Sequence, residues 1–545
     1  MRFYFAGAIV FLLLGCYGSR NGGEEDPNRD LICSRTTTNV RLFDIKDYEG
    51  QRVSSLDALS AYQWHLKNFA QKTGAGTNDY SSKAISSGAD LRVESAWNYA
   101  TGNGVIIAVI DTGMDASHPD LKPNYNAALS WNYVKNQQDP YPYNTTVACA
   151  HGTATAGIAA AKGGNGGAIG VAPDATIAAL NIGFCENANA SNSEIADALS
   201  VARTSRGNNL PIDIFSNSWG CHPTANPCYV ASETVEAITE GAAYGRNGKG
   251  SIYIFAAGNY RYLNERSDHS PLLNLFEVLP IAALDAQDKY AIYSNSGANL
   301  LVSAYGGYGG DRPGILTTDI VGCNTGFNAD RFMQHKENRY GGFTTLMNGS
   351  SAATPMAAGA VALMLETNHN LTQREVRYIL ATTARKNDPS DSDWKQNGAG
   401  WNINHNYGFG AIDAYNAVQT ARSFISFGAL LERNASAFNA NPINISDTRI
   451  AKIEYVDINV KLNKSYDDKC GFNLTLKRDG ATDAVFMKND RSYNIVSGGD
   501  YHFATPRFLD ESDKGIWSLT LDYLTPSCPN GLGIDWWKIR IRGRN

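Results

Sequence analysis

Four polar side chains stand where this sequence is expected to pass between strands, helices and loops. They are Asp111, His151, Asn259 and Ser351. Each has an ordinary structural explanation when taken alone, because an aspartate often sits in a turn, a histidine often packs in a core and a serine often begins a helix. Their joint presence, in the order aspartate, histidine, serine, instead predicts a nucleophile with its base.

Peptide hydrolysis assigns one role to each of these residues. Ser351 attacks the carbonyl carbon, and His151 takes its proton and later gives it to the leaving amine. Asp111 holds the imidazole in the required tautomer. The Asn259 amide and the backbone N–H of Ser351 donate to the oxyanion, and one such donor is worth ~3 kcal/mol in the transition state.

The elements expected to position these residues form an α/β fold. Apolar runs without alternation predict strands buried on both faces, as in a parallel sheet, and these runs cover residues 105–110, 212–215 and 251–257. Ala-rich stretches predict helices at residues 153–161, 195–203, 232–244 and 352–365. Ligands bind beyond the carboxyl ends of such strands, which is where Asp111, Ser218 and Asn259 are expected.

The pattern changes after about residue 425. Val456, Ile458 and Val460 alternate with polar residues, and period-two segments follow around Phe472, Trp517 and Trp537. Alternation of this kind, separated by turn residues, predicts a β-sandwich.

Composition limits the class of protein. The chain has 545 residues, 43% of them hydrophobic and 18% charged, with a formal net charge of −6. The length suggests two to four domains with a large core, and global disorder is excluded. Mild acidity argues against binding to nucleic acid, since such proteins usually present a basic face.

The first residues predict export and a lipid anchor. A short basic start precedes an apolar run at residues 3–14, which is too short to span a bilayer and resembles a signal peptide. Leu13-Leu14-Gly15-Cys16 resembles a bacterial lipobox, so residues 1–16 are expected to be a lipoprotein signal and Cys16 the lipidated residue. Residues 17–45 are expected to form a polar tether. The expected location is the bacterial cell envelope, at the outer membrane or cell surface, and the chain would be secreted if the anchor were absent. Ordinary cleavage, with Cys16 discarded, is the alternative.

Eight cysteines remain after Cys16, and an even number suits disulfides in an exported chain. Cys221 and Cys228 bracket a short loop and are expected to pair. Cys470 and Cys528 are the two cysteines of the last hundred residues and are expected to pair with each other. The sequence leaves four unassigned: Cys33, Cys149, Cys185 and Cys323.

Motifs around the four polar residues resemble those of subtilisin-like serine proteases. The matching segments are Asp111-Thr112-Gly113, His151-Gly152-Thr153 and Gly349 to Pro355, and further stretches at 63–66, 118–121, 216–220, 248–259 and 407–413 resemble the kexin/furin branch. The resemblance implies a subtilisin-like parallel sheet flanked by helices at residues 46–424. An all-β jelly-roll or sandwich P domain is implied at 425–545. One departure is Ser350, where the family usually has threonine.

The resemblance also implies a substrate-binding set, which comprises Ser216, Ser218, Trp219, Gly220 and Gly258. Kexin and furin cleave after paired basic residues because acids line their pockets. Here Thr112 and the segment 221–224 stand in those places, so strict dibasic cleavage is not expected, since burying a cation without a counter-charge is costly. Asp268 and Glu265 are the remaining candidates for an acid.

A structural Ca²⁺ site is the cofactor that the resemblance implies. Its ligands are Asp57, Asp120 and Asn165, with loop carbonyls around residues 166–169, and hard oxygen ligands suit this ion. The alternative is that Asp57 caps a helical turn and Asn165 only shapes a loop. Asn132 and Asn295 are neutral at the family's other calcium positions, which are expected to be lost.

About forty residues separate Cys16 from Asp57, and this segment is shorter than the folding prodomain of most subtilisin-like proteases. We therefore expect help in folding from a separate partner or from the P domain alone. The expected function is a lipid-anchored serine endopeptidase acting on proteins or peptides. The alternative is a catalytically silent lipoprotein that binds a ligand on a protease scaffold.

Overall fold

The computed structural model describes most of the chain from residue 59 onward. The described residues are 59–69, 86–163, 167–185, 188–200, 211–221, 229–307, 313–322, 325–329, 342–464, 470–479, 482–488, 500–524, 526 and 528–545.

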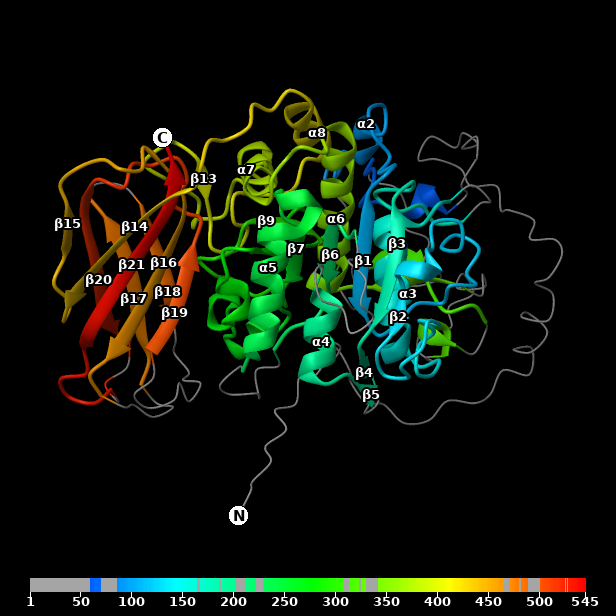
Figure 1. Ribbon diagram of the computed structural model, residues 1–545, viewed down its shortest axis with the longest axis horizontal. Helices are drawn as coiled ribbons and strands as arrows, with labels where there is room; N and C mark the ends of the chain where they lie inside the picture. The colour runs from blue at the N-terminus through cyan, green and yellow to red at the C-terminus, as the bar shows by residue number, and fades with distance from the viewer. Residues whose placement is uncertain are drawn as a thin grey trace, which may run out of the picture.

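A seven-stranded sheet forms the centre of the α/β region (Figure 1). Its strands, in spatial order, are β2 (Trp131–Asn132), β3 (Thr176–Asn181), β1 (Ile106–Asp111), β6 (Ile214–Asn217), β7 (Ile252–Ala256), β8 (Val278–Leu284) and β9 (Val302–Tyr305). All neighbours in this sheet are parallel. The expectation of a parallel sheet is therefore confirmed.

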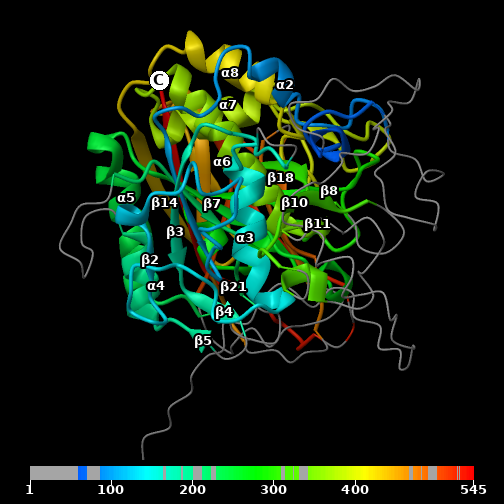
Figure 2. The same ribbon diagram turned by 90° about the vertical axis from the view of Figure 1, so that its right-hand side faces the viewer.

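Helices cover both faces of the sheet, and this explains the unbroken apolar runs. Ile107 and Val109 of β1 belong to the core that includes α3 and α6, whereas Ala108 and Ile110 belong to the core that includes α4 and α5. Successive side chains of a strand point to opposite faces, so every position of β1 needs an apolar residue. Figure 2 shows α4 and α5 on one side and α3 on the other.

The helices of this region have the following bounds: α2 (Val93–Ala96), α3 (Val147–Ala160), α4 (Asn192–Leu199), α5 (Ser232–Gly248), α6 (Ser350–Thr367), α7 (Gln373–Thr383) and α8 (Ala414–Arg422). The short strands are β4 (Gly183–Cys185), β5 (Ala188–Asn189), β10 (Ile315–Thr318), β11 (Phe343–Met347), β12 (Lys395–Gln396) and β13 (Asn402–Ile403). Short 3₁₀ turns η4 (Arg261–Leu263), η5 (Ser267–His269) and η6 (Leu272–Asn274) lie between β7 and β8.

One helix begins earlier than the sequence suggested. We expected His151 to precede a helix at 153–161, but α3 starts at Val147 after Thr146 in an extended conformation. His151 therefore lies inside the helix, in its second turn. Ala148 and Ala150 favour helix strongly, and they extend it backwards past the histidine.

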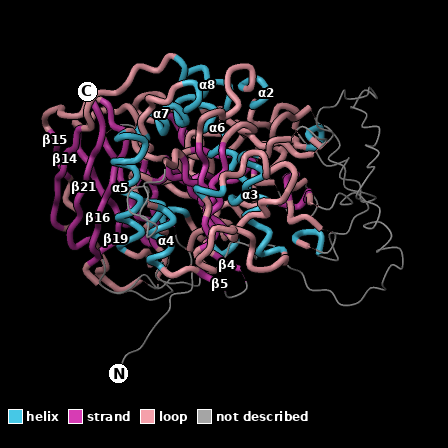
Figure 3. Tube along the Cα trace, turned by 45° about the vertical axis from the view of Figure 1, so that its right-hand side comes forward, coloured by secondary structure: helices cyan, strands magenta, loops and turns pink. Residues whose placement is uncertain are grey.

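Two antiparallel sheets form the C-terminal β region (Figure 3). One contains β14 (Leu431–Phe438), β21 (Ile534–Arg544), β16 (Lys452–Leu462) and β19 (Asp500–Thr505), and the other contains β15 (Ile443–Ile445), β20 (Gly515–Tyr523), β17 (Phe472–Arg478) and β18 (Asp483–Lys488). Side chains from both sheets share one core around Trp517 and Trp537. The alternating segments found in the sequence are strands, as expected.

An arginine and a tyrosine of α7 join the two regions. Arg374 donates to both carboxylate oxygens of Glu454 at 2.8 and 2.7 Å, and Tyr378 donates to Asp510 at 2.9 Å. Such pairs add little net stability over apolar packing, but removing one partner leaves the other charge buried and typically costs about 3–5 kcal/mol. The pairs therefore make the docking of the two regions specific.

His405 also connects the two regions. Its Nδ1 lies 2.9 Å from an Asp393 oxygen, and its Nε2 accepts the backbone N–H of Val485 in β18 at 3.3 Å. An Nε2 that accepts a hydrogen bond carries no proton, so the imidazole is neutral with its proton on Nδ1. Burial and the nearby Arg507 lower the pKa of His405 to about 4.

We expect this histidine to make the protein less stable in mild acid. Its pKa is depressed in the folded chain, so the unfolded chain binds a proton first as the pH falls below 6.5. Between pH 6.5 and 4 the free energy of unfolding should drop by up to about 3 kcal/mol on account of His405. Thermal or denaturant unfolding across this range measures the drop, and His405→Gln should reduce it.

The control is His369→Gln, which changes a histidine that is exposed in the structure. It should leave the pH dependence of wild type intact. An unchanged acid-side slope in His405→Gln would contradict the assignment, since other buried histidines such as His65 would then account for it.

Candidate active site

The carboxyl ends of three adjacent strands bring the expected residues to one edge of the sheet. The strands β1, β6 and β7 are neighbours, and they end at Asp111, Asn217 and Ala256. Because these strands are parallel, Asp111 and the segments that follow the other two lie at the same edge. Contacts with α3 and α6 then complete the site.

Asp111 and His151 form a buried pair. Nδ1 of His151 lies 2.7 Å from Oδ1 of Asp111, and both residues are about 1% exposed. The same carboxylate oxygen accepts the N–H of Thr112 at 2.7 Å, and the other oxygen accepts Thr155 Oγ1 at 3.3 Å. These donors hold the carboxylate in the orientation that faces the imidazole.

Small residues allow α3 to approach β1 this closely. A Cβ on Gly152 would lie 2.1 Å from the backbone oxygen of Gly113 and 3.0 Å from the Cβ of Asp111. Any side chain at this position would therefore push the helix away from the strand. Thr112 fastens the approach, because its hydroxyl donates to Cys149 O at 2.8 Å and accepts the N–H of Gly152 at 2.9 Å.

A disulfide also fixes the start of α3. Cys149 pairs with Cys185 of β4, which the sequence did not assign. The bond ties the turn that precedes His151 to the β4–β5 hairpin. Cys470–Cys528 pairs as expected. Cys221 is disulfide-bonded, but its expected partner Cys228 lies outside the described residues.

Ser351 lies in the first turn of α6, one residue after the helix begins. Its hydroxyl donates to the backbone oxygen of Ser218 at 3.2 Å, and the hydroxyl of Ser218 donates to Ser351 O at 2.9 Å. Attack on a carbonyl requires the Ser351 hydroxyl to donate to His151 instead, and catalytic contacts often tighten only when substrate binds. The first N–H groups of a helix have no acceptor within it, so this turn favours negative charge.

Two hydrogen bonds determine which way the Asn259 amide faces. Its Oδ1 accepts both the N–H and the hydroxyl of Ser350, each at 2.8 Å. The Nδ2 group therefore lies on the other side, toward Gly349, where a Cβ would lie 2.7 Å from it. Gly349 also has φ +98°, a conformation that glycine adopts without strain.

Residues that the sequence analysis missed support this geometry. Thr155 lies one helical turn after His151 on α3. This four-residue spacing was the signal in the sequence that could have placed both side chains beside Asp111. Tyr293 has no such signal in the sequence. Its hydroxyl accepts the N–H of Gly349 at 2.9 Å and donates to Gly306 O at 2.8 Å, so it positions the turn that precedes Ser351.

The expected substrate-binding residues divide into two groups. Ser216 and Trp219 are buried, and the Trp219 ring packs against Phe184 and Phe255 with centroids 5.6 and 5.2 Å away. Their side chains support the strand end from inside the core. Gly220 faces open space, since a Cβ there would meet no atom within 4 Å. Ser218 and Gly258 lie beside Ser351 and Ser350.

The two acids considered for a basic-side-chain pocket have other roles. Asp268 is buried and receives Arg266 Nε and Nη2 at 2.9 and 2.7 Å, together with the N–H of Ala298. Its charge is already balanced. Glu265 lies 3.7 Å from His269 Nδ1, and burial lowers the pKa of His269 to about 4.

One of the three expected calcium ligands lies among the described residues. Asp120 is buried, and its Oδ2 accepts the N–H of Ala168 at 2.9 Å. A Cβ on Gly167 would lie 2.0 Å from this oxygen, so the carboxylate packs tightly against the predicted ligand loop. Asp57 and Asn165 lie outside the described residues, as does Cys16. Within the described part of the chain, no group of three or more histidine, cysteine, aspartate or glutamate residues is placed to hold a metal.

Comparisons with known proteins identify the family of this chain. A family model described as the subtilase family matches residues 102–410. Neuroendocrine convertase 2 of Bos taurus is 27% identical over 540 residues, which cover 94% of this chain and 78% of that protein. Furin-like protease 1, isoform 1-CRR, of Drosophila melanogaster is 27% identical and covers 80% of this chain and 38% of that protein.

A solved structure shares the fold over most of the chain. The serine protease of Aeromonas sobria, in a crystal structure of its complex with a chaperone, has a TM-score of 0.77 at 22% identity. The match covers 91% of this chain and 96% of that one. It includes the C-terminal β region, because a match of this extent cannot be confined to residues 102–410.

Proposed function

The chain is a serine endopeptidase of the subtilase family, and we propose that Asp111, His151 and Ser351 form its catalytic triad. The observation that carries the proposal is the buried 2.7 Å contact between His151 Nδ1 and Asp111. This contact keeps the proton on Nδ1, so Nε2 is the nitrogen that acts as the base.

The reaction proceeds in two halves. As Ser351 Oγ bonds to the carbonyl carbon, its proton passes to His151, which then protonates the leaving amine. A water molecule repeats the sequence on the acyl-enzyme, with His151 again taking a proton and returning it to Ser351. Asp111 stabilises the imidazolium in both halves.

The oxyanion receives two donors in this proposal. One is Asn259 Nδ2, which Ser350 turns toward Gly349 by occupying Oδ1. The other is the N–H of Ser351 at the start of α6. Donors fixed before the reaction need no reorganisation when negative charge develops, which is why each lowers the barrier.

Substrate binds as an extended segment along Gly220, where the structure leaves open space. Two positions considered for an acid in the pocket for the residue before the scissile bond offer no free carboxylate. Thr112 has a hydroxyl there, which donates to Cys149 O, and the carboxylate of Asp268 is paired with Arg266. We therefore expect no requirement for paired basic residues. A peptide-library profile dominated by such pairs would contradict this.

The test of the nucleophile is labelling by a fluorophosphonate probe, which reacts with an activated serine. Ser351→Ala should abolish labelling of the full chain. The matched control is Ser350→Ala, which removes the neighbouring hydroxyl and loosens Asn259 but keeps the nucleophile. It should still label, with a rate lowered by roughly tenfold to a hundredfold for a weakened oxyanion donor. Labelling that persists in Ser351→Ala would refute the assignment. Failure of folded wild type to label, verified by its melting curve, would favour the silent ligand-binding alternative.

A structural Ca²⁺ ion is the cofactor we infer, held by Asp57, Asp120, Asn165 and loop carbonyls. The buried Asp120 carboxylate beside Gly167 and Ala168 supports the proposal, because carboxylate oxygens are ligands that this ion prefers. When bound, the ion would stabilise the folded chain without taking part in the reaction.

Removal of calcium should lower stability by about 2–3 kcal/mol at saturating ion. We expect a chelator to lower the melting temperature of wild type. Asp120→Asn should melt lower even without chelator and respond little to it. Asp139→Asn is the control, since Asp139 is exposed and accepts only a local backbone N–H. A chelator without effect on wild type would argue against the site.

We also propose a lipid anchor at Cys16, in the bacterial envelope, and a separate folding partner. The lipobox-like segment supports the anchor, and among the described residues no helix has the length and apolar character needed to cross a bilayer. The Aeromonas sobria protease is known in complex with a chaperone, which supports the partner.

One expression experiment addresses both proposals. The chain is produced alone in a heterologous bacterium, as wild type and as Cys16→Ser. Wild type should fractionate with membranes and Cys16→Ser should not, while probe labelling should be weak in both until the partner is supplied. Equal fractionation would refute the anchor, and rapid refolding of the purified chain to full activity would refute the partner.

A further inference from the structure

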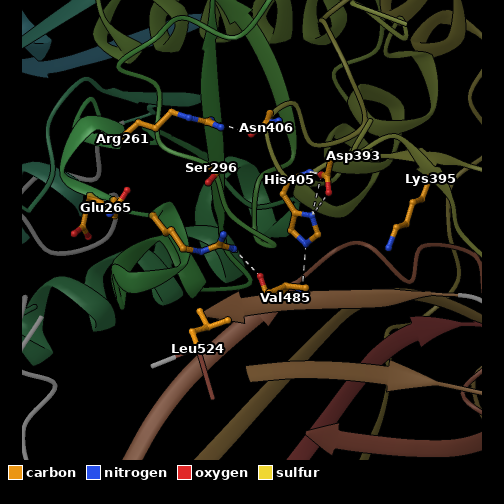
Figure 4. A pocket seen from close by; sticks show the side chains of 11 residues that line it. Arg261, Glu265, Ser296, Asp393, Lys395, His405, Asn406, Val485 and Leu524 are labelled. Carbon is orange, nitrogen blue, oxygen red and sulfur yellow. Dashed lines mark hydrogen bonds and ion pairs between the residues drawn. The ribbon is translucent and has the colours of Figure 1, made fainter. Parts of the chain in front are cut away.

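A cleft lies where the α/β region meets the C-terminal β region (Figure 4), with a volume of about 580 Å³. The side chains that concern us are Arg261, Arg266, Ser296 and His405 from the first region and Val485 and Leu524 from the second. We call it the joint cleft. None of the four candidate catalytic residues lines it, whereas Glu265, considered above as an acid of the substrate pocket, does.

Arg261 brings an incompletely balanced charge to the joint cleft. Its Nη1 donates to Asn406 Oδ1 at 2.9 Å, and its guanidinium lies over the Tyr290 ring at 4.1 Å. Among the described residues no carboxylate lies within 4.0 Å of it. Burial lowers the pKa of Arg261, and repulsion from Arg266 adds to the effect, whereas Tyr290 and the more distant Asp391 oppose it.

Two further donors face the same space. The Ser296 hydroxyl has no acceptor among the described residues, and it lies near the centre of the cleft in Figure 4. Arg266 uses Nε and Nη2 for Asp268 and Val485 O, which leaves Nη1.

The acids that line the joint cleft have partners other than Arg261 and Ser296. Both oxygens of Asp393 face the ring or the backbone N–H of His405. Glu265 lies at the opposite edge of Figure 4, beside His269. Arg261 Nη1 donates to Asn406 Oδ1 and, at 3.5 Å, to Ser294 O, so the guanidinium has protein acceptors but no carboxylate in contact. An anion placed between Arg261 and Ser296 would supply that opposite charge, and charge-assisted hydrogen bonds of this kind are strong.

The size and the rim of the cleft indicate more than a small ion. A volume of 580 Å³ lies within the range of sites that hold organic ligands, and a lone carboxylate would fill little of it. Val485 and Leu524 offer apolar surface on the β side. The ligand should thus carry an apolar portion next to its negative group.

We propose that the joint cleft binds a peptide through a carboxylate, with Arg261 and Ser296 as donors and Leu524 against an apolar side chain of the peptide. The carboxylate belongs either to an acidic side chain or to the end of the peptide. The proposal does not depend on proteolysis, so it is tested on protein whose nucleophile is blocked by a sulfonyl fluoride, which also closes the active site to the probe.

The probe is a fluorescein-labelled peptide of alternating leucine and glutamate with an amidated end. Its fluorescence anisotropy should rise with the blocked full chain. A second peptide has glutamine in place of glutamate and an amidated end, and it should not bind. A third has glutamine and a free carboxylate, and its binding tells whether the chain end can supply the anion.

Arg261→Gln should weaken binding of the glutamate peptide about tenfold, the scale of one lost charge-assisted contact. Ser296→Ala should weaken binding of the same peptide less. The matched control is Arg449→Gln, which removes an exposed arginine of the C-terminal β region and should bind as wild type does. Melting curves verify that each variant is folded. Equal affinity in Arg261→Gln, an equal loss in Arg449→Gln or no binding of any carboxylate peptide would overturn the proposal.

Discussion

A carboxylate held out of water beside an imidazole is the constraint on which the rest of this site depends. Burying Asp111 is unfavourable unless its oxygens are satisfied, and the donors come from Thr112, His151 and Thr155. Two of these donors belong to α3, so the helix must lie directly against the end of β1. The glycine at 152 and the link between Cys149 and Cys185 serve that approach.

The parallel sheet could be predicted because its cause is visible in the sequence. A strand covered by helices on both faces needs apolar residues at successive positions. β7 shows this throughout, and β1 shows it up to Ile110, before it ends at Asp111. The three catalytic candidates could be predicted from type and order for a related reason. Strand ends and helix starts leave local signals, and the chemistry of acyl transfer allows few residue types.

The features that escaped prediction depend on contacts between distant segments. Cys149 and Cys185 have no local signal, because their pairing follows from how α3 meets the β4–β5 hairpin. From the sequence alone Asp268 could be a free acid, but in the structure its carboxylate is paired with Arg266. Trp219 belongs to a motif of the substrate cleft, yet its ring faces the core, and a sequence does not tell which way a strand-end side chain turns.

Neutral asparagines illustrate how the same loop can be held in two ways. Asn295 accepts the N–H of Tyr260 at 2.8 Å, and Asn132 accepts the N–H of Lys135 and donates to Tyr141 O. A cation would gather only oxygens, whereas an amide binds a donor and an acceptor at once. Because an amide is covalently part of the chain, it holds the loop at any ion concentration. Asn295 thus holds the segment behind Asn259 through a hydrogen bond that belongs to the chain itself.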